Sequence, residues 1–182
     1  DEFIELVNYG LLPLNISGFT ISDATQQRFS FPAGKIIPAG ESAVVFGGGR
    51  PTGSFGNAMV NGLVFTASGL SLDNGGDTIT IEDNFGMPVD GRTYPSVDGS
   101  ANQSITRSPD ISGLFVRHSQ ASGSSGALFS PGTRINGTTF SDGPRITQIS
   151  PDQVLQSNSP FDLEVVGINF DPSALVLIDF IA

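Results

Sequence analysis

The stretch LSLDNGGDTITI, residues 70–81, carries the pattern that best indicates the fold class. Apolar and polar residues alternate on both sides of Asp73–Asp77, and this period of two is typical of strands with one buried face. Asn-Gly and Gly-Gly pairs supply the positive φ angles that tight hairpin turns require. The stretch therefore predicts a β-hairpin with strands at 70–72 and 78–81.

The same pattern extends over most of the chain, and helical periodicity is hard to find. Turn residues recur at the spacing of roughly 8–12 residues that is typical of a sandwich. We expect a bend at Gly18, a loop over 47–62 and a second hairpin turn at 83–86. Further strands are predicted at 3–7, 14–21, 28–32, 35–37, 42–46, 89–90, 103–107 and 113–118. The predicted fold class is all-β, an immunoglobulin-like β-sandwich followed by a partial second one.

Composition agrees with a folded β protein. Hydrophobic residues make up 38% of the 182 residues and charged residues 14%, which is enough apolar material for a core and too little charge for a disordered tail. Gly 23 and Pro 12 are spread along the chain, as expected for many short strands joined by tight turns. With 14 Phe and no Trp, the core should be built on Phe, Val, Leu and Ile.

Charge and residue usage argue against several classes of function. The formal net charge is −10, with one lysine, Lys35, so the average potential repels phosphate and we expect neither nucleic acid nor anionic membrane surfaces as partners. No apolar run reaches 18 residues, so we expect no membrane insertion. The absence of Cys excludes disulfides, and a single histidine, His118, excludes a multi-His metal site.

A second domain is predicted after residue 140. A polar turn at 141–144 follows a Ser/Gly-rich stretch at 119–126, and new strands are expected at 145–149, 161–166 and 174–178. About 40 residues cannot close a sandwich alone, so we expect domain 1–140, linker 141–144 and an incomplete domain 145–182. The chain opens in what resembles the middle of a strand, and we expect both ends to be cut from a longer protein.

Four acidic or amide residues in the turns suggest calcium as a ligand: Asp73, Asn74, Asp77 and Asp83. Their spacing does not match an EF-hand loop. The favoured interpretation is that these side chains bond their own turn backbone, with calcium left open.

Three further patterns contain residues used in catalysis or phosphate binding but lack the rest of the motif. His118 with Ser119 and Asp110 could form a hydrolase triad, but no Gly-x-Ser-x-Gly turn is present, and we expect a solvated histidine at a strand end. Gly47-Gly48-Gly49-Arg50 lacks the Gly-Lys-Ser/Thr ending of a phosphate loop. The carboxylate pairs of Glu2 with Glu5 and Glu82 with Asp83 could serve glycoside hydrolysis, but nothing places either pair across a cleft.

Arg107 is the most interesting single residue, because it could pair with Asp110 or Asp90 or contact a ligand, and we favour the structural role. Glycosylation sequons begin at Asn15, Asn102 and Asn136. In a bacterial chain we expect them to be unused.

The first part of the chain resembles the lamin-tail domain, an immunoglobulin-type sandwich of nuclear lamins and many secreted bacterial proteins. The resemblance spans about 140 residues, and its blocks occur in the family's order. They are EFIELVN at 2–8, LNISGFTISD at 14–23, FPAGKIIPAG at 31–40, VVF at 44–46, LDNGGDTI at 72–79, VD at 89–90, QSITR at 103–107 and SPGT at 130–133.

One departure from the family matters. Members usually begin with an additional strand of the kind Val-Ile-Asn-Glu-Val before the Glu-Phe-Ile-Glu block, and that strand is missing here. One sheet should then expose an edge that invites pairing with a neighbour.

The second part is similar to the start of an IPT/TIG domain, another Ig-like module. The match rests on ISP at 149–151 and FDLEVVGINF at 161–170. The later strands of such a domain are absent from the chain.

These observations predict a non-enzymatic structural or interaction module of a secreted or cell-surface bacterial protein. We expect no catalytic, cofactor-binding or metal-binding residues, an unknown protein or surface glycan as ligand, and a monomer or weak edge-strand contacts. The alternative is an accessory domain of a secreted nuclease or phosphatase whose catalytic domain lies outside the chain. A nuclear lamin tail that binds chromatin has the same fold, but the acidic charge opposes it.

Overall fold

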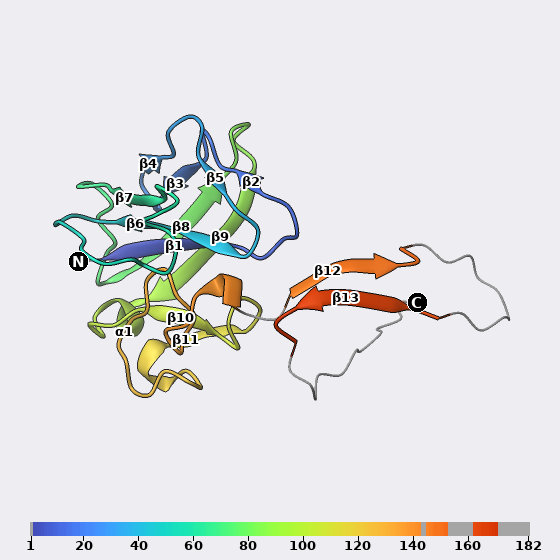
Figure 1. Ribbon diagram of the computed structural model, residues 1–182. Helices are drawn as coiled ribbons and strands as arrows, with labels where there is room; N and C mark the ends of the chain where they lie inside the picture. Colours follow the sequence, from blue (N-terminus) through green and yellow to red (C-terminus); the bar gives the residue numbers. More distant parts are fainter. Residues whose placement is uncertain (1, 143–144, 153–161, 171–182) are drawn as a thin grey trace, which may run out of the picture. The chain divides into compact units, whose positions relative to one another are not determined.

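In the computed structural model, contacts divide the chain into two compact units, Asp1–Ser141 and Asp142–Ala182 (Figure 1). The structure describes residues 2–142, 145–152 and 162–170. The strand predicted at 174–178 and part of the predicted linker lie outside the described residues. The first unit, called unit 1 below, is an immunoglobulin-like β-sandwich, which confirms the predicted fold class.

Unit 1 consists mainly of short strands. They are β1 (Phe3–Asn8), β2 (Leu14–Asn15), β3 (Thr20–Ser22), β4 (Gln27–Ser30), β5 (Ile36–Ile37), β6 (Glu41–Phe46), β7 (Val64–Thr66), β8 (Gly76–Glu82), β9 (Pro88–Pro95), β10 (Ile105–Ser108) and β11 (Leu114–Arg117). Single helical turns form at α1 (Ser96–Gly99), η1 (His118–Gln120) and η2 (Phe140–Asp142). Gly18 has φ +77°, which confirms the bend between β2 and β3.

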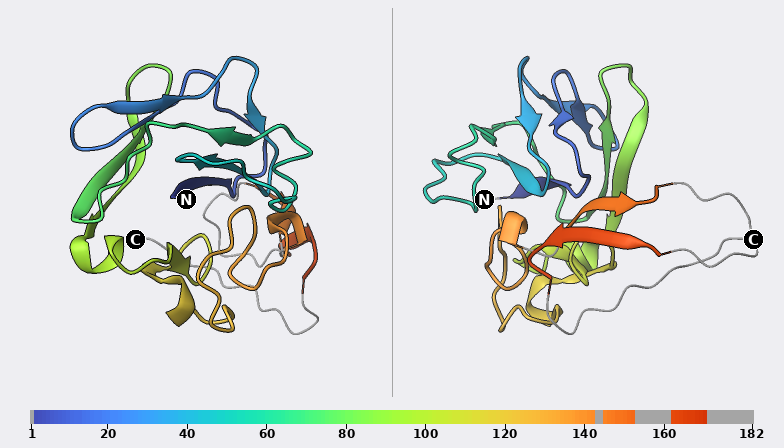
Figure 2. Two further views of the ribbon diagram at one scale, coloured as in Figure 1. Left: turned by 90° about the vertical axis from the view of Figure 1, so that its left-hand side faces the viewer. Right: turned by 45° about the vertical axis from the view of Figure 1, so that its right-hand side comes forward.

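Two sheets make up the sandwich. One has the order β1-β6-β7 and the other β4-β3-β8-β9, while β2 with β5 and β10 with β11 form separate pairs. β6 and β7 run parallel, and the other pairs are antiparallel. The two views of Figure 2 show β8 and β9 as the long green hairpin along one side of unit 1. In these orders β1 and β9 are both edge strands.

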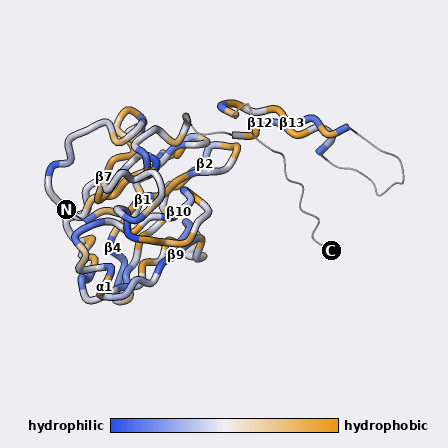
Figure 3. Tube along the Cα trace, turned by 90° about the horizontal axis from the view of Figure 1, so that it is seen from below, coloured by the Kyte–Doolittle hydropathy of each residue, from blue (hydrophilic) through white to orange (hydrophobic). Residues whose placement is uncertain are grey.

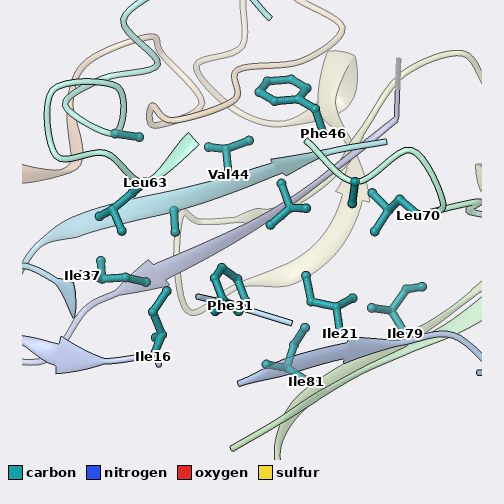
Figure 4. Packing of buried hydrophobic residues seen from close by; sticks show 14 residues of the cluster. Ile16, Ile21, Phe31, Ile37, Val44, Phe46, Leu63, Leu70, Ile79 and Ile81 are labelled. Atoms are coloured by element: carbon teal, nitrogen blue, oxygen red, sulfur yellow. The ribbon is translucent and has the colours of Figure 1, made fainter. Parts of the chain in front are cut away.

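The core lies around β6, which is buried on both faces from Ser42 to Phe46. Figure 4 shows Phe31 and Ile21 on one side of the β1–β6 pair, with Val44 and Phe46 on the other. Burying a large apolar side chain stabilises the fold by about 1.5–3 kcal/mol, so this double-sided burial makes β6 the central strand of the unit.

Aromatic packing completes the core, as the phenylalanine content predicted. Ring centroids lie 5.0–5.5 Å apart among Phe29, Phe31 and Phe65, and Phe46 lies 5.0 Å from Phe55. The tilted and edge-on geometries are those that aromatic pairs prefer.

Of the predicted hairpin at 70–81, the strand at 78–81 is confirmed as part of β8, but the strand at 70–72 and its pairing with β8 are wrong. Ser71 has φ +53°, a left-handed conformation that no strand contains, and Leu70 is fully buried as a loop residue of the core. The strand β8 instead pairs with β3 and, through the turn at 83–87, with β9. Of the two predicted hairpin turns, the one at 83–86 therefore joins two paired strands, β8 and β9.

The second unit contains a described two-stranded antiparallel ribbon, β12 (Arg145–Ser150) and β13 (Glu164–Ile168), with an irregularity between Ile146 and Gln148. Both strands carry hydrophobic residues, drawn in orange in Figure 3, and Ile149 and Val166 are each about 40% exposed (44% and 40%). The described side chains of this ribbon are less buried than those of the central strands of unit 1.

Candidate binding groove

Within the part of the chain that the structure describes, β1 pairs along one side, with β6. Gly47 N donates to Glu2 O at 2.8 Å, so the Glu2 main chain points at β6, and by alternation so does that of Ile4 and Leu6. The intervening pair Glu5 and Val44 faces the other way, because Val44 N donates to Leu63 O at 2.9 Å on the β7 side. The N–H and C=O groups of Phe3, Glu5 and Val7 therefore point away from the sheet.

This free side of β1 borders a groove of about 880 Å³. Consecutive residues of β1, from Phe3 to Val7, line it, so the groove wraps around the strand edge and is not confined to one face. Opposite β1 lie Ile79 and Ile81 of β8 and residues 89–92 of β9. Strands β10 and β11 and the segment 129–133 complete the lining.

Two carboxyl groups lie in the polar part of the groove. Glu5 Oε1 accepts a hydrogen bond from Gly132 N at 2.8 Å, and Asp110 Oδ1 accepts one from Ile135 N at 3.2 Å. Burial raises the pKa of Glu5 to about 8; hydrogen bonds from Gly132 and Ser42 oppose the rise, and the charge of Asp110 adds to it. Glu5 thus holds a proton near neutral pH, when an exposed glutamate would be ionised.

Asp110 follows the same trend. Burial raises the pKa of the Asp110 carboxyl above its usual value, while the hydrogen bond from Ile135 and the positive charge of Arg134 oppose the rise. Among the described residues, neither Glu5 nor Asp110 forms an ion pair.

Arg107 contacts an aromatic ring and one carboxylate. Its guanidinium carbon lies 4.4 Å from the ring centroid of Phe115, and that of Arg92 lies 4.8 Å from the same centroid. Arg107 Nη2 is 3.8 Å from Asp90 Oδ1, and Nη1 donates to Gly113 O at 3.2 Å. Asp90, and not Asp110, is thus the carboxylate next to Arg107, and these contacts hold β9 against the β10–β11 pair.

The expectation of a solvated His118 is wrong. His118 is only 1% exposed and starts η1, with Nδ1 2.8 Å from Ala127 O and Nε2 2.8 Å from Ser130 Oγ. Ser119 Oγ donates to Gln103 Oε1 at 2.7 Å and has no hydrogen bond to the histidine. The hydrolase triad does not assemble, because both imidazole nitrogens anchor the segment 127–130.

The acidic turn residues do not converge on one point. Asp73 Oδ1 accepts from Gly75 N, Asp77 Oδ1 from Thr78 N and Asp83 Oδ1 from Phe85 N, each at 2.6–2.8 Å. Asp77 and Asp83 lie at opposite ends of β8, about 20 Å apart for a seven-residue strand. Within the described residues no group of three or more His, Asp or Glu could hold a metal ion.

The remaining candidate residues are also separate. Glu2 and Glu5 lie on opposite faces of β1, and Glu2 accepts a hydrogen bond from Leu72 N. Glu82 Oε2 is 3.4 Å from Thr20 Oγ1, away from the groove. In the loop at 47–50, Gly49 has φ +72° and no described helix follows, so the loop does not form a phosphate cradle.

The sequons lie in turns or at the end of a strand. Asn15 Oδ1 accepts from Ser17 Oγ at 2.6 Å, and Asn136 Oδ1 accepts from Thr138 Oγ1 at 2.8 Å. Asn102 has φ +52°. The side-chain amides of Asn15 and Asn136 thus stabilise local turns of the backbone.

The sequence did not indicate this groove as a binding site. Its residues come from several segments spread between Glu2 and Phe140 and share no motif. Within the described residues, no helix has the length and apolar character needed to cross a membrane.

Comparisons with known proteins bear on the family to which the chain belongs. A search of curated proteins finds no match. The family model of the lamin tail domain matches residues 1–96, more than half of the 182 residues. The blocks at 103–107 and 130–133 lie beyond the matched range, while the matched range includes both sheets of the sandwich. The chain therefore belongs to the lamin tail domain family.

Proposed function

We propose that unit 1 is a non-catalytic binding module of a secreted or cell-surface bacterial protein, where it spaces, tethers or attaches other domains. The observation that carries this proposal is the groove of about 880 Å³ between β1 and β9. Its size and its mixture of apolar walls with a few polar groups are typical of binding sites. Its ligand is a protein or a surface glycan.

The contacts of the candidate catalytic residues support a binding role. His118 has both ring nitrogens in hydrogen bonds, Ser119 is bonded to Gln103, and Arg107 is stacked on Phe115. These three side chains are thus used to hold the fold. The family is one of Ig-like interaction domains, which agrees with this assignment.

The second unit, in our proposal, is the start of an IPT/TIG-like domain. The antiparallel pairing of β12 with β13 is the arrangement expected of two strands of such a domain, and their exposed isoleucine and valine side chains would become buried in a complete sandwich. A tandem of Ig-like modules is common in extended surface proteins, and the acidic net charge of −10 suits a soluble exterior.

A matched pair of variants tests the binding role. The purified chain is screened against arrays of peptides and glycans, with Thr106→Arg placing a long charged side chain in the groove and Thr66→Arg placing the same one on exposed β7. We expect saturable binding that Thr106→Arg reduces at least tenfold and Thr66→Arg leaves unchanged.

Enzyme assays on the same samples test the alternative class. We expect no release of phosphate from phosphoesters and no cleavage of DNA or RNA. Turnover by the chain that is unaffected by contaminant removal would contradict the proposal. The alternative of an accessory domain would gain support if a nuclease or phosphatase domain adjoined this chain in the parent reading frame.

A further inference from the structure

Residues 130–135, called the strap below, form no strand and belong to neither sheet. The hydrogen bonds that join main chain to main chain in the strap are local. Thr133 N donates to Ser130 O at 3.0 Å, and Arg134 N donates to Thr138 O at 2.9 Å. Within the described part of the chain, no such bond joins the strap to a strand. The hydrogen bonds that hold the strap to the sheets must therefore come from side chains.

Three side chains from three different parts of unit 1 supply these bonds. Glu5 of β1 accepts a hydrogen bond from Gly132 N at 2.8 Å, and Asp110, between β10 and β11, accepts one from Ile135 N at 3.2 Å. His118 of η1 has its Nε2 2.8 Å from the hydroxyl oxygen of the first strap residue. All three are titratable types of side chain, so protonation acts directly on the groups that hold the strap.

Packing adds two contacts but does not make the strap part of the core. Gly132 lies so close to the loop at 55–56 that a Cβ there would overlap Phe55 O, and Ile135 is 4% exposed. The buried hydrophobic cluster around β6 includes no residue of the strap. A segment with few core contacts opens at a lower free energy than the sheets it covers. The strap can therefore open while the core stays closed.

Glu5 has the least favourable surroundings for a charge. The residue keeps some exposed surface, but its carboxyl end is enclosed by the strap, by Ser42 of β6 and by Asp110. Burial raises the pKa of Glu5 to about 8, and the negative charge of Asp110 adds to the rise. Arg134 of the strap and His118 of η1 favour the ionised form of Asp110, while the charge that acts on Glu5 is the negative one of Asp110.

Opening of the strap is linked to loss of the Glu5 proton. In the closed strap Glu5 keeps this proton up to about pH 8, whereas a hydrated glutamate has the usual pKa of about 4.5. Water reaches the carboxyl group when the strap lifts, so opening releases the proton at any pH between these two values. Opening therefore becomes easier as pH rises from about 4.5 to 8, and no easier above that range.

We propose that the strap is a pH-sensitive switch, closed while Glu5 holds its proton and released ahead of the sheets when Glu5 ionises. This goes beyond the proposed binding role and depends on no ligand. Ser130 and Thr133 also line the groove, so release of the strap would move part of the groove wall.

The direct test exploits the absence of cysteine from the chain, because a single introduced thiol then reports opening at one position. Ile135→Cys reports opening of the strap, and Ile21→Cys, at a fully buried position of β3, reports opening of the sheets. Labelling by an aromatic disulfide is followed at pH 5.5 and pH 8.5, and each rate is divided by that of free cysteine. We expect position 135 to label at least tenfold faster at the higher pH, and at least tenfold faster there than position 21.

A matched pair of glutamate variants assigns the effect to Glu5. Glu5→Gln, combined with Ile135→Cys, removes the titrating group but keeps an oxygen that accepts from Gly132 N. Its labelling at position 135 should be the same at both pH values. Glu2→Gln, on the opposite face of β1, is the control and should keep the full response to pH.

Trypsin gives a second measurement on the native strap, since it cleaves after Arg134. The rate of this cleavage is compared with that in a free peptide of residues 130–138, at pH 7 and pH 8.5. We expect the ratio to rise about fivefold in the native chain and to stay constant in Glu5→Gln. This result decides the question if Ile135→Cys fails to fold.

Two outcomes would overturn the inference. Equal labelling at positions 135 and 21 would show that unit 1 opens as a whole and that the strap does not open first. A response to pH that is missing from the native strap, or that persists in Glu5→Gln, would remove Glu5 as the switching residue. Neither outcome affects the binding role, which the array screen tests separately.

Discussion

Glu5 places a carboxyl group inside an edge strand, and this single residue makes stability depend on pH. Because burial raises the pKa of Glu5 to about 8, the folded state keeps a proton that the unfolded state loses above about pH 4.5. Stability should therefore fall as pH rises from about 4.5 to 8 and change little above that range. The effect is on the order of 5 kcal/mol for a shift of this size.

Glu5→Gln removes this titration but retains an oxygen to accept from Gly132 N. We expect the variant to match the native chain near pH 4.5 and to exceed its free energy of unfolding at pH 8.5, as measured by urea denaturation at each pH. Glu164→Gln, on an exposed position of β13, is the matched control and should leave the pH dependence unchanged. Equal slopes for the native chain and Glu5→Gln would contradict the assignment.

His118 is a residue whose structural role the sequence could not reveal. A lone histidine beside a serine resembles part of a catalytic triad. Only the fold shows that both ring nitrogens are hydrogen-bonded within unit 1. His118→Ala should cost about 2–4 kcal/mol, since it leaves a buried void and removes two hydrogen bonds. Chemical denaturation checks this, with Ser119→Ala as a milder control; a loss below about 1 kcal/mol for His118→Ala would refute the role.

At the scale of elements, two loops of unit 1 come into close backbone contact at two glycines. Gly56 has φ +60° and Gly132 has φ +80°, and a Cβ on either would overlap the carbonyl oxygen of the facing segment, that of Gly132 or of Phe55. We expect Gly132→Ala to cost roughly 3–5 kcal/mol, because backbone strain adds to overlap that neither segment can relieve.

Gly137 provides the control for this prediction. Its φ is +82°, but nothing lies within 4 Å of a Cβ there. Gly137→Ala should therefore cost only about 1–2 kcal/mol, the penalty of the left-handed conformation alone. Thermal denaturation of the two variants side by side measures the difference, and equal losses would show that the close crossing does not limit the fold.

The turns at both ends of β8 carry the acidic residues once considered for calcium. Because Asp73, Asp77 and Asp83 each accept hydrogen bonds from turn amides and lie at two separate ends of the strand, we expect millimolar calcium to leave the melting temperature unchanged. A chelator titration on the same sample is the control. A rise with calcium that the chelator reverses would require a site that these turns do not show.

Strand positions were predictable where local patterning matched the final pairing. Alternation at 3–7 and the apolar run at 42–46 became β1 and β6, since their side chains are sorted by the two faces of a sheet. β7 was missed because it has three residues and pairs in parallel with a strand 20 positions earlier. Residues 70–72 were assigned to a strand because burial of Leu70 gives the same apolar signal in a loop as in a strand.

The groove could be anticipated only in part. The block Glu-Phe-Ile-Glu predicted the strand that lines the groove, but the volume of the groove depends on where β9, β10 and the segment 129–133 fold back. Likewise, the sequence left two possible partners for Arg107, Asp90 and Asp110. The connection from β9 to β10 decides which of the two carboxylates lies beside it. Such distances are set by chain topology, which local sequence does not encode.

For the whole molecule, unit 1 has its own core. All of the buried hydrophobic cluster, from Ile16 to Ile81, lies within residues 1–141. We expect residues 1–141 produced alone to fold and to unfold in one cooperative transition, followed by circular dichroism and by amide exchange. The complete chain is the control; a fragment with no transition, or with two, would contradict the division into units.

The single-sided attachment of β1 has a mechanical consequence. When unit 1 is pulled along β1, the row of bonds to β6 is what resists detachment of this strand among the described residues. Any chain segment that pairs with the other side of β1 would contribute a second row that must break at the same time. The force needed to pull unit 1 apart should thus rise when β1 is paired on both sides.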